Sequence, residues 1–121
     1  VCGAHLSGLA LNHQLTERGG RLVAATTTAD AYRLYALPGG PPQRPGLLRD
    51  DERGAAIEVE VWELPAHRFG DFVDAIPEPL GIGRVELADG NRVAGFLCEP
   101  AGLAGAEELT YLGGWRAYTG R

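Results

Sequence analysis

Hydrophobic and polar residues alternate most regularly over residues 56–64, which predicts a β-strand. One face of this strand carries Ile57, Val59 and Val61, and the other carries Glu58, Glu60 and Trp62. The two glutamates lie about 7 Å apart along the strand. If their face lines a pocket, one carboxylate can have a raised pKa and act as an acid or a base. If it is an outer face, both are solvated.

Further strands are expected on both sides of this one. Residues 21–28 are β-branched and residues 31–37 are apolar and aromatic, so we expect two strands that pair with each other. Residues 46–49 fit a short strand. Residues 84–87 and 93–98 flank an Asp-Gly step, which is typical of a hairpin.

Helical spacing appears in several shorter segments. Leu11 and Leu15 are four residues apart in residues 9–18, where Asn12 can cap a helix that Gly19-Gly20 would end. A second apolar stripe begins after Pro65 and ends at Pro77. Short helices are expected after Pro100 and around Trp115. Proline- and glycine-rich loops are expected at residues 38–46 and 77–83, and a charged turn at residues 50–54.

These elements predict an α+β fold: a small, bent, mostly antiparallel β-barrel or sheet flanked by short helices. With 121 residues, 45% of them hydrophobic, the chain is expected to form a single domain, 1–121. Its 18 glycines and 8 prolines favour short strands and tight turns. The chain begins with Val in an apolar run, so we expect it to be a fragment of a longer protein.

The charge pattern argues against polyanionic partners. The formal net charge is −5 and the 11 basic residues are scattered, so we expect no nucleic acid and no membrane as a partner. No apolar run reaches the roughly 20 residues that span a bilayer, and no signal peptide is visible, so a cytoplasmic location is expected. Cys2 and Cys98 are expected to be apolar fillers, and the three histidines lack metal-ligand spacing, so no metal is predicted.

The first nine residues carry the most suggestive chemistry. The apolar start is typical of a strand, and it meets Gly3 and Gly8 with His5 between them; a helix is expected to follow. Such a turn points backbone N–H groups into one small space, where they favour a carboxylate. Near neutral pH, His5 can give or take a proton. The alternative is that the glycines only supply unusual backbone angles and that His5 is an ordinary loop residue.

Other polar residues are candidates for the same site. Arg44, in the proline-rich loop, could hold a carboxylate with two hydrogen bonds, or it could be simply exposed. Tyr35 could donate a hydrogen bond inside a pocket, or it could pack in its strand. Ser7 lies near His5, but no third member of a nucleophilic triad is identifiable.

Taken together, a series of segments in order along nearly the whole chain resembles the C-terminal domain of allophanate hydrolase. They include Gly3-Ala4-His5-Leu6-Ser7-Gly8 and Gly113-Gly114-Trp115-Arg116. The others are residues 11–13, 32–38, 45–47, 56–62, 76–83 and 95–99. The resemblance implies a γ-glutamylcyclotransferase-like fold, in which the amides of the first turn bind a carboxylate. This chain keeps the glycine of that turn and lacks its tyrosine and serine.

The resemblance also implies a reaction. The amidase region of allophanate hydrolase, absent from these residues, leaves N-carboxycarbamate, and the C-terminal domain assists its decarboxylation in urea and allophanate degradation. His5 would then be the general acid that protonates the nitrogen, without any cofactor. The residues expected around this small dicarboxylate are Gly3, Ala4, Leu6, Ser7, Asn12, Tyr35, Arg44, Glu58 and Glu60.

Two other functions remain open. The domain could be a non-catalytic module that docks on the amidase region of the parent chain or forms a homodimer, which the apolar tail around Trp115 suggests. It could also be a γ-glutamylcyclotransferase-like enzyme. Those enzymes use a glutamate after the central helix, and the nearest carboxylate here is Glu78, between two prolines.

Overall fold

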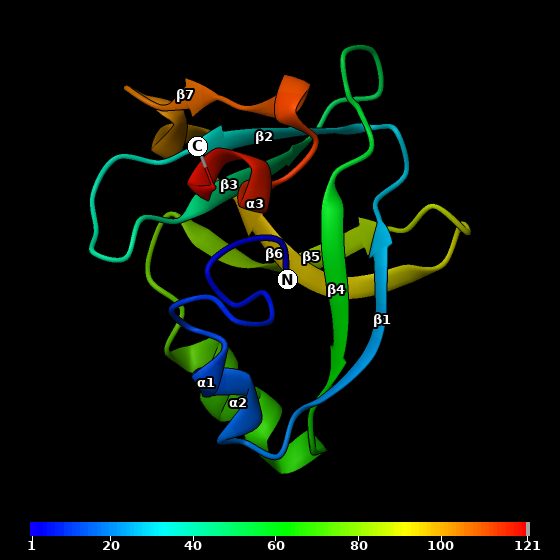
Figure 1. The fold of residues 1–121 in the computed structure, drawn as a ribbon, viewed down its shortest axis with the longest axis vertical. Coiled ribbons are helices and arrows are strands. Elements are labelled where there is room, and N and C mark those ends of the chain that lie inside the picture. The colour runs from blue at the N-terminus through cyan, green and yellow to red at the C-terminus, as the bar shows by residue number, and fades with distance from the viewer. Residues whose placement is uncertain (121) are drawn as a thin grey trace.

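The computed structural model describes residues 1–120, whose strands form three separate antiparallel sheets. β1 (Arg21–Thr27) pairs with β4 (Glu58–Glu63), and β5 (Leu80–Glu86) pairs with β6 (Arg92–Cys98). β2 (Tyr32–Ala36) lies between β3 (Pro45–Arg49) and β7 (Glu107–Glu108). Figure 1 shows β2 and β3 crossing one end of the long β1–β4 pair. The predicted α+β class is confirmed, and the sheets of the described chain do not close into one barrel.

The helices are short and lie outside the sheets. They are α1 (His13–Thr16), α2 (Ala66–Asp74) and α3 (Trp115–Thr119), with 3-10 turns η1 (Pro100–Leu103) and η2 (Thr110–Leu112). α1 and α2 lie together at the end of the molecule away from β2 (Figure 1). An ion pair of 2.9 Å joins Arg18, just after α1, to Asp71 in α2. None of the helices described is long and apolar enough to cross a membrane.

The expected pairing of residues 21–28 with 31–37 is wrong. At the end of β1, Thr28 is fully buried, and its hydroxyl accepts a hydrogen bond of 3.0 Å from the amide of Ile57. Its backbone also bridges to Leu87, so the chain crosses to another sheet here. The Ala29-Asp30 step lacks the residues that favour a two-residue hairpin turn. β1 therefore pairs with β4, and β2 with β3 and β7.

The N-terminal segment also differs from its prediction. The first residues form successive turns rather than a strand, and the helix expected over residues 9–18 is confined to α1. The side chain of Asn12 makes no cap, because its amide nitrogen donates instead to the carbonyl of His5 at 2.9 Å. A further correction is that β5 begins at Leu80, inside the expected loop over residues 77–83. Pairing with β6 extends the strand through its glycines.

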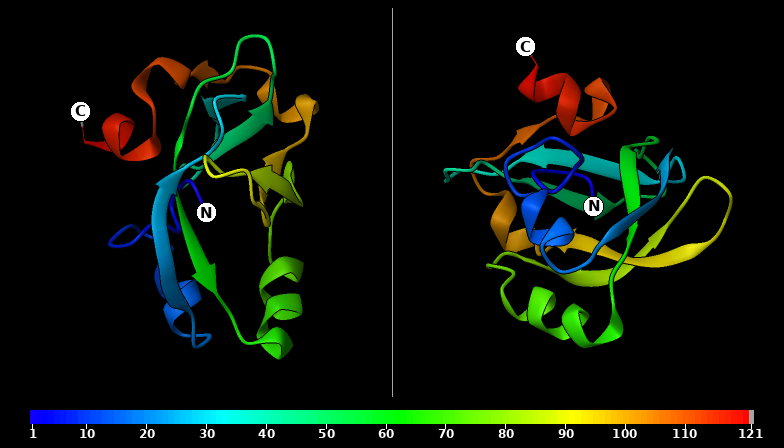
Figure 2. Two further views of the ribbon diagram at one scale, coloured as in Figure 1. Left: turned by 90° about the vertical axis from the view of Figure 1, so that its right-hand side faces the viewer. Right: turned by 60° about the horizontal axis from the view of Figure 1, so that its bottom comes forward.

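The sheets face one another in the side view of Figure 2, and the buried core residues come from these sheets and the segments packed on them. The fully buried side chains of this core include Tyr32 and Leu34 of β2, Ile57 next to β4, and Leu6 and Leu109. Trp115, only 2% exposed, seals this core from the start of α3. The N-terminal turns are thereby packed against β4 on one side and the C-terminal helix on the other.

Candidate functional site

The N-terminal turn is held through its carbonyl groups. The Gly3 carbonyl accepts from the amide of Leu6 at 2.9 Å, and the Ala4 carbonyl from the amide of Leu11 at 2.8 Å. The His5 carbonyl accepts from Asn12. These three bonds fix the backbone on both sides of the His5 side chain. Asn12, an expected substrate contact, is therefore a support of the turn.

The amide groups of the same residues remain available. Leu6 and Ser7 donate their N–H groups inside the protein, to Gly3 and to Glu60. Within residues 1–120, the N–H groups of Gly3, Ala4 and His5 have no hydrogen-bond acceptor. All three residues are buried, and buried N–H groups almost always have a partner. An anionic ligand would supply the acceptor that they lack.

The ring of His5 lies inward and is only 9% exposed. It stacks on Phe96 with centroids 5.2 Å apart and meets the edge of Phe72 at 5.3 Å. Its Nε2 lies 2.7 Å from Oε1 of Gln14. Because an amide oxygen only accepts, Nε2 is the protonated nitrogen of the neutral ring and Nδ1 carries the lone pair. Burial lowers the pKa of His5 below 6.5, although the bond to Gln14 opposes this shift.

A small cavity of about 20 Å³ lies beside this ring. It is lined by Cys2, Gly3, Ala4, His5, Arg44, Pro45, Leu80 and Phe96. The structure thus brings together four of the residues predicted for one site: Gly3, Ala4, His5 and Arg44. Arg44 is half-buried, and its positive charge contributes to the lowered pKa of His5.

Gly3 serves close packing at this cavity. A Cβ atom at this position would lie 2.4 Å from Cδ of Pro45, which is well inside van der Waals contact. Gly8 is the residue of the turn with a positive φ, at +79°. The glycine pair therefore does two different things: Gly3 admits the Pro45 ring and Gly8 reverses the chain.

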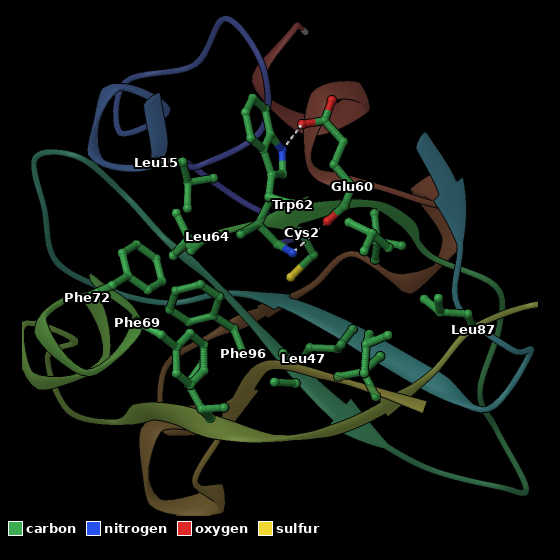
Figure 3. Close-up of a pocket in the computed structure, with 18 of the residues that line it drawn as sticks. Cys2, Leu15, Leu47, Glu60, Trp62, Leu64, Phe69, Phe72, Leu87 and Phe96 are labelled. Atoms are coloured by element: carbon green, nitrogen blue, oxygen red, sulfur yellow. Dashed lines mark hydrogen bonds between the residues drawn. The ribbon is translucent and has the colours of Figure 1, made fainter. Parts of the chain in front are cut away.

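A second, larger cavity of about 430 Å³ has a mostly apolar lining (Figure 3). Trp62, Leu64 and Phe69 line it together with Phe72 and Phe96. Cys2 and Phe96 line both cavities, so the large apolar space and the His5 site share part of one wall.

Glu58 and Glu60 share a strand face, as predicted, but their carboxylates bind protein groups. Oε1 of Glu60 accepts from the indole nitrogen of Trp62 at 3.0 Å (Figure 3) and from the amide of Ser7 at 2.8 Å. Arg116 forms ion pairs with Glu60 at 3.2 Å and with Glu58 at 3.3 Å. Burial alone would raise the pKa of Glu60, but the hydrogen bonds outweigh it and lower that pKa. A raised pKa, which an acid–base role would need, is not found at Glu60.

The remaining predicted residues lie away from the small cavity. Tyr35 packs in β2 beside the guanidinium of Arg33, 5.5 Å from its ring centroid, and Leu6 is part of the core. Glu78 is exposed before β5. Trp115 is buried in the core, whereas Tyr111 in the same tail is 73% exposed, so the docking alternative stays a prediction. Within residues 1–120, no three His, Cys, Asp or Glu side chains are grouped to hold a metal ion.

Sequence reasoning missed the partners of His5. Gln14, Phe72 and Phe96 come from three different elements and carry no motif in the sequence. Arg116 belongs to the segment Gly113-Gly114-Trp115-Arg116 that carries the resemblance, but nothing in the sequence places it beside Glu60. Only contacts far apart along the chain bring these residues together.

The fold and the site define a small α+β domain with a buried histidine on an N-terminal turn rich in available amides. The chain belongs to the family of allophanate hydrolase C-terminal domains, whose model matches residues 1–120. Over 98% of its length it is 46% identical to a urea amidolyase of Saccharomyces cerevisiae, of which it spans 7%.

Solved structures agree with this assignment. The chain matches an allophanate hydrolase of Kluyveromyces lactis with a TM-score of 0.95 and 42% identity, covering 98% of this chain and 20% of that one. It also matches c4763, described as a uropathogenic E. coli-specific protein, with a TM-score of 0.91 and 38% identity. That match covers 99% of this chain and 92% of the other, so a solved chain of nearly this extent exists.

Proposed function

We propose that this domain assists the decarboxylation of N-carboxycarbamate in allophanate and urea breakdown, with His5 as the general acid. The observation that carries the proposal is one small cavity lined by Gly3, Ala4, His5 and Arg44. Three of these residues, Gly3, Ala4 and His5, have backbone N–H groups that lack an acceptor within residues 1–120. A site built from N–H donors, a cation and a titratable ring suits a small dicarboxylate.

In the proposed reaction the bond between the nitrogen and one carboxylate carbon breaks. The electron pair of that bond stays on nitrogen, CO₂ leaves, and one proton reaches the nitrogen, so the dianion and a proton give carbamate and CO₂. The amides of the turn and Arg44 hold the carboxylate that remains. The Phe96 and Leu80 side chains border the cavity and reduce hydration of the carboxylate that departs.

The proton is best supplied through Nδ1 of His5. Nε2 is engaged by Gln14, so Nδ1 is the nitrogen that takes up a proton. In the free protein, burial keeps the ring neutral by lowering its pKa. A dianionic ligand next to the ring favours the charged form and raises the pKa, so proton uptake accompanies binding. The acid is thereby created only when the substrate is present.

The cavity must widen to admit this substrate. A space of about 20 Å³ holds about one water molecule. Arg44 lies in the loop between β2 and β3, which forms one wall. We expect outward movement of this loop when the dicarboxylate binds, because the opposite walls belong to β5, β6 and the hydrogen-bonded turn.

The test adds this chain to a separately prepared amidase region that produces N-carboxycarbamate from allophanate, and follows CO₂ release. We expect His5→Ala to slow the assisted release by about 10²-fold. His67→Ala, at an exposed position of α2, is the matched control and should release CO₂ at the wild-type rate. Equal rates with and without the chain, or with His5→Ala, would contradict the proposal.

A further inference from the structure

Glu60 contacts both ends of the turn that carries His5. At one end its amide donates to the carbonyl of Val1 at 3.0 Å. At the other end its carboxylate accepts from the amide of Ser7 at 2.8 Å and from the Ser7 hydroxyl at 3.0 Å. The turn that carries His5 is thus bound to β4 through Glu60, by its main chain at one end and by its side chain at the other.

The rest of Ser7 is held by the cation that pairs with Glu60. Nη2 of Arg116 donates to the Ser7 carbonyl at 2.8 Å and lies 3.2 Å from Oε2 of Glu60. The amide, hydroxyl and carbonyl of Ser7 are therefore all bound by one carboxylate–guanidinium pair. Glu60 is only 5% exposed, so water competes little for these bonds.

We propose that Glu60, with Arg116, is a positioning residue for His5: the pair fixes Ser7 and thereby sets where the His5 ring and the neighbouring amides stand. This inference rests on the proposed function only where it concerns the rate. Its structural content, control of the His5 environment by a residue that does not contact the ring, stands independently of the reaction.

The C-terminal segment is built to bring Arg116 to this place. The amide of Glu58 donates to the carbonyl of Gly113 at 2.8 Å, and a Cβ atom at Gly114 would lie 2.8 Å from Cβ of Glu58. Only glycine allows the backbone before α3 to approach β4 so closely. The approach places Arg116 between Glu58 and Glu60.

Glu60→Gln tests the inference, and Glu58→Gln is its matched control. Both substitutions remove one negative charge from the same strand and one partner from Arg116, but Glu58 is half-exposed and its carboxylate binds Arg116 rather than the turn. A glutamine at position 60 retains one acceptor oxygen and places an NH₂ group among the donors Trp62, Ser7 and Arg116. The hold on Ser7 is expected to loosen.

The first readout is the pKa of each histidine, measured by NMR on the folded chain. His5 faces Gln14, Arg44, His13 and the N-terminal ammonium of Val1. The first three groups are unchanged in both variants, whereas the ammonium also interacts with Glu60 and is part of the environment that this residue controls. We expect Glu60→Gln to move the pKa of His5 toward 6.5 because a looser turn admits water. Glu58→Gln should leave the pKa of His5 unchanged.

The second readout is assisted CO₂ release. We expect Glu60→Gln to lower it about tenfold, since small misplacements of an acid are costly, and Glu58→Gln to change it less than twofold. If Glu60→Gln unfolds the chain, Arg116→Lys replaces it. Lysine keeps the charge but lacks the planar guanidinium, whose Nη2 reaches Ser7 and Glu60 while Nη1 pairs with Glu58. A folded variant with an unmoved His5 pKa would overturn the inference.

The two proposals fail differently. An altered His5 pKa in Glu60→Gln together with full activity of His5→Ala would keep the positioning role and remove the acid role. An unaltered His5 pKa in Glu60→Gln together with slow release by His5→Ala would do the reverse.

Discussion

Replacing Phe96 by alanine would remove an aromatic ring that lines both cavities. The ring of Phe96 stacks on His5 and meets the edge of Phe72 at 5.9 Å between centroids. It also lines both the 430 Å³ cavity and the small cavity. Without it, His5 would lose its flat apolar neighbour and face a larger, more accessible space.

The cost can be estimated from these contacts. Truncation of a fully buried phenylalanine costs about 3–5 kcal/mol, and each aromatic pair contributes about 0.5–1.5 kcal/mol of this. Phe96 is only half-buried and its cavity is already open on one side, so less apolar contact is lost. We expect the free energy of unfolding to fall by about 2–4 kcal/mol. The pKa of His5 should rise toward 6.5, because desolvation is the main cause of its lowering.

Urea unfolding measures the first quantity, and an NMR titration of the three histidines measures the second. Phe69→Ala is the matched control, because Phe69 lines the same large cavity but is 40% exposed, while the ring contacts of His5 are with Phe72 and Phe96. It should cost less stability and leave the pKa of His5 in place. A folded Phe96→Ala variant whose His5 pKa equals that of the wild type would refute the account of His5 as a ring desolvated by its aromatic neighbours.

Two further predictions concern the same turn. Gly3→Ala should destabilise the chain by about 1–3 kcal/mol, because the new Cβ overlaps the Pro45 ring. Gly81→Ala is the control, because its Cβ meets no atom within 4 Å. Equal urea-unfolding midpoints for the two variants would contradict this prediction. Stability should fall as the pH drops below about 6.5, since the unfolded chain then binds a proton that the buried His5 resists. His5→Ala should weaken the dependence of stability on pH between pH values of about 7 and 5.5, which lie above the range where carboxylates titrate. An unchanged dependence would show that His5 is not its cause.

Local signals predicted most individual elements. The alternation of residues 56–64 gave β4, the Asp89-Gly90 step marked the hairpin of β5 and β6, and the stripe after Pro65 gave α2. These signals are local because strand alternation, turn chemistry and helical spacing act within a few residues. Four predictions failed: the N-terminal strand, the pairing of β1, the length of α1 and the start of β5. At these places contacts between groups far apart in the sequence compete with local preference.

The candidate site was only partly predictable for the same reason. His5, Gly3, Ala4 and Arg44 were singled out by residue type and meet at one cavity. Glu60 was singled out too, as an acid or base, but the structure uses its carboxylate to hold Ser7. The role of a carboxylate depends on which donors surround it, and those donors come from the N-terminus, β4 and α3.

Residue type and spacing indicate the class of fold and a turn that carries His5, and the resemblance indicates the family. Strand pairing, the burial of His5 between Phe72 and Phe96 and the binding of Glu60 to protein groups all depend on contacts between distant parts of the chain. The physical reason is that a pKa and a hydrogen-bond partner are set by everything within a few ångströms, and folding fills that space from distant parts of the chain.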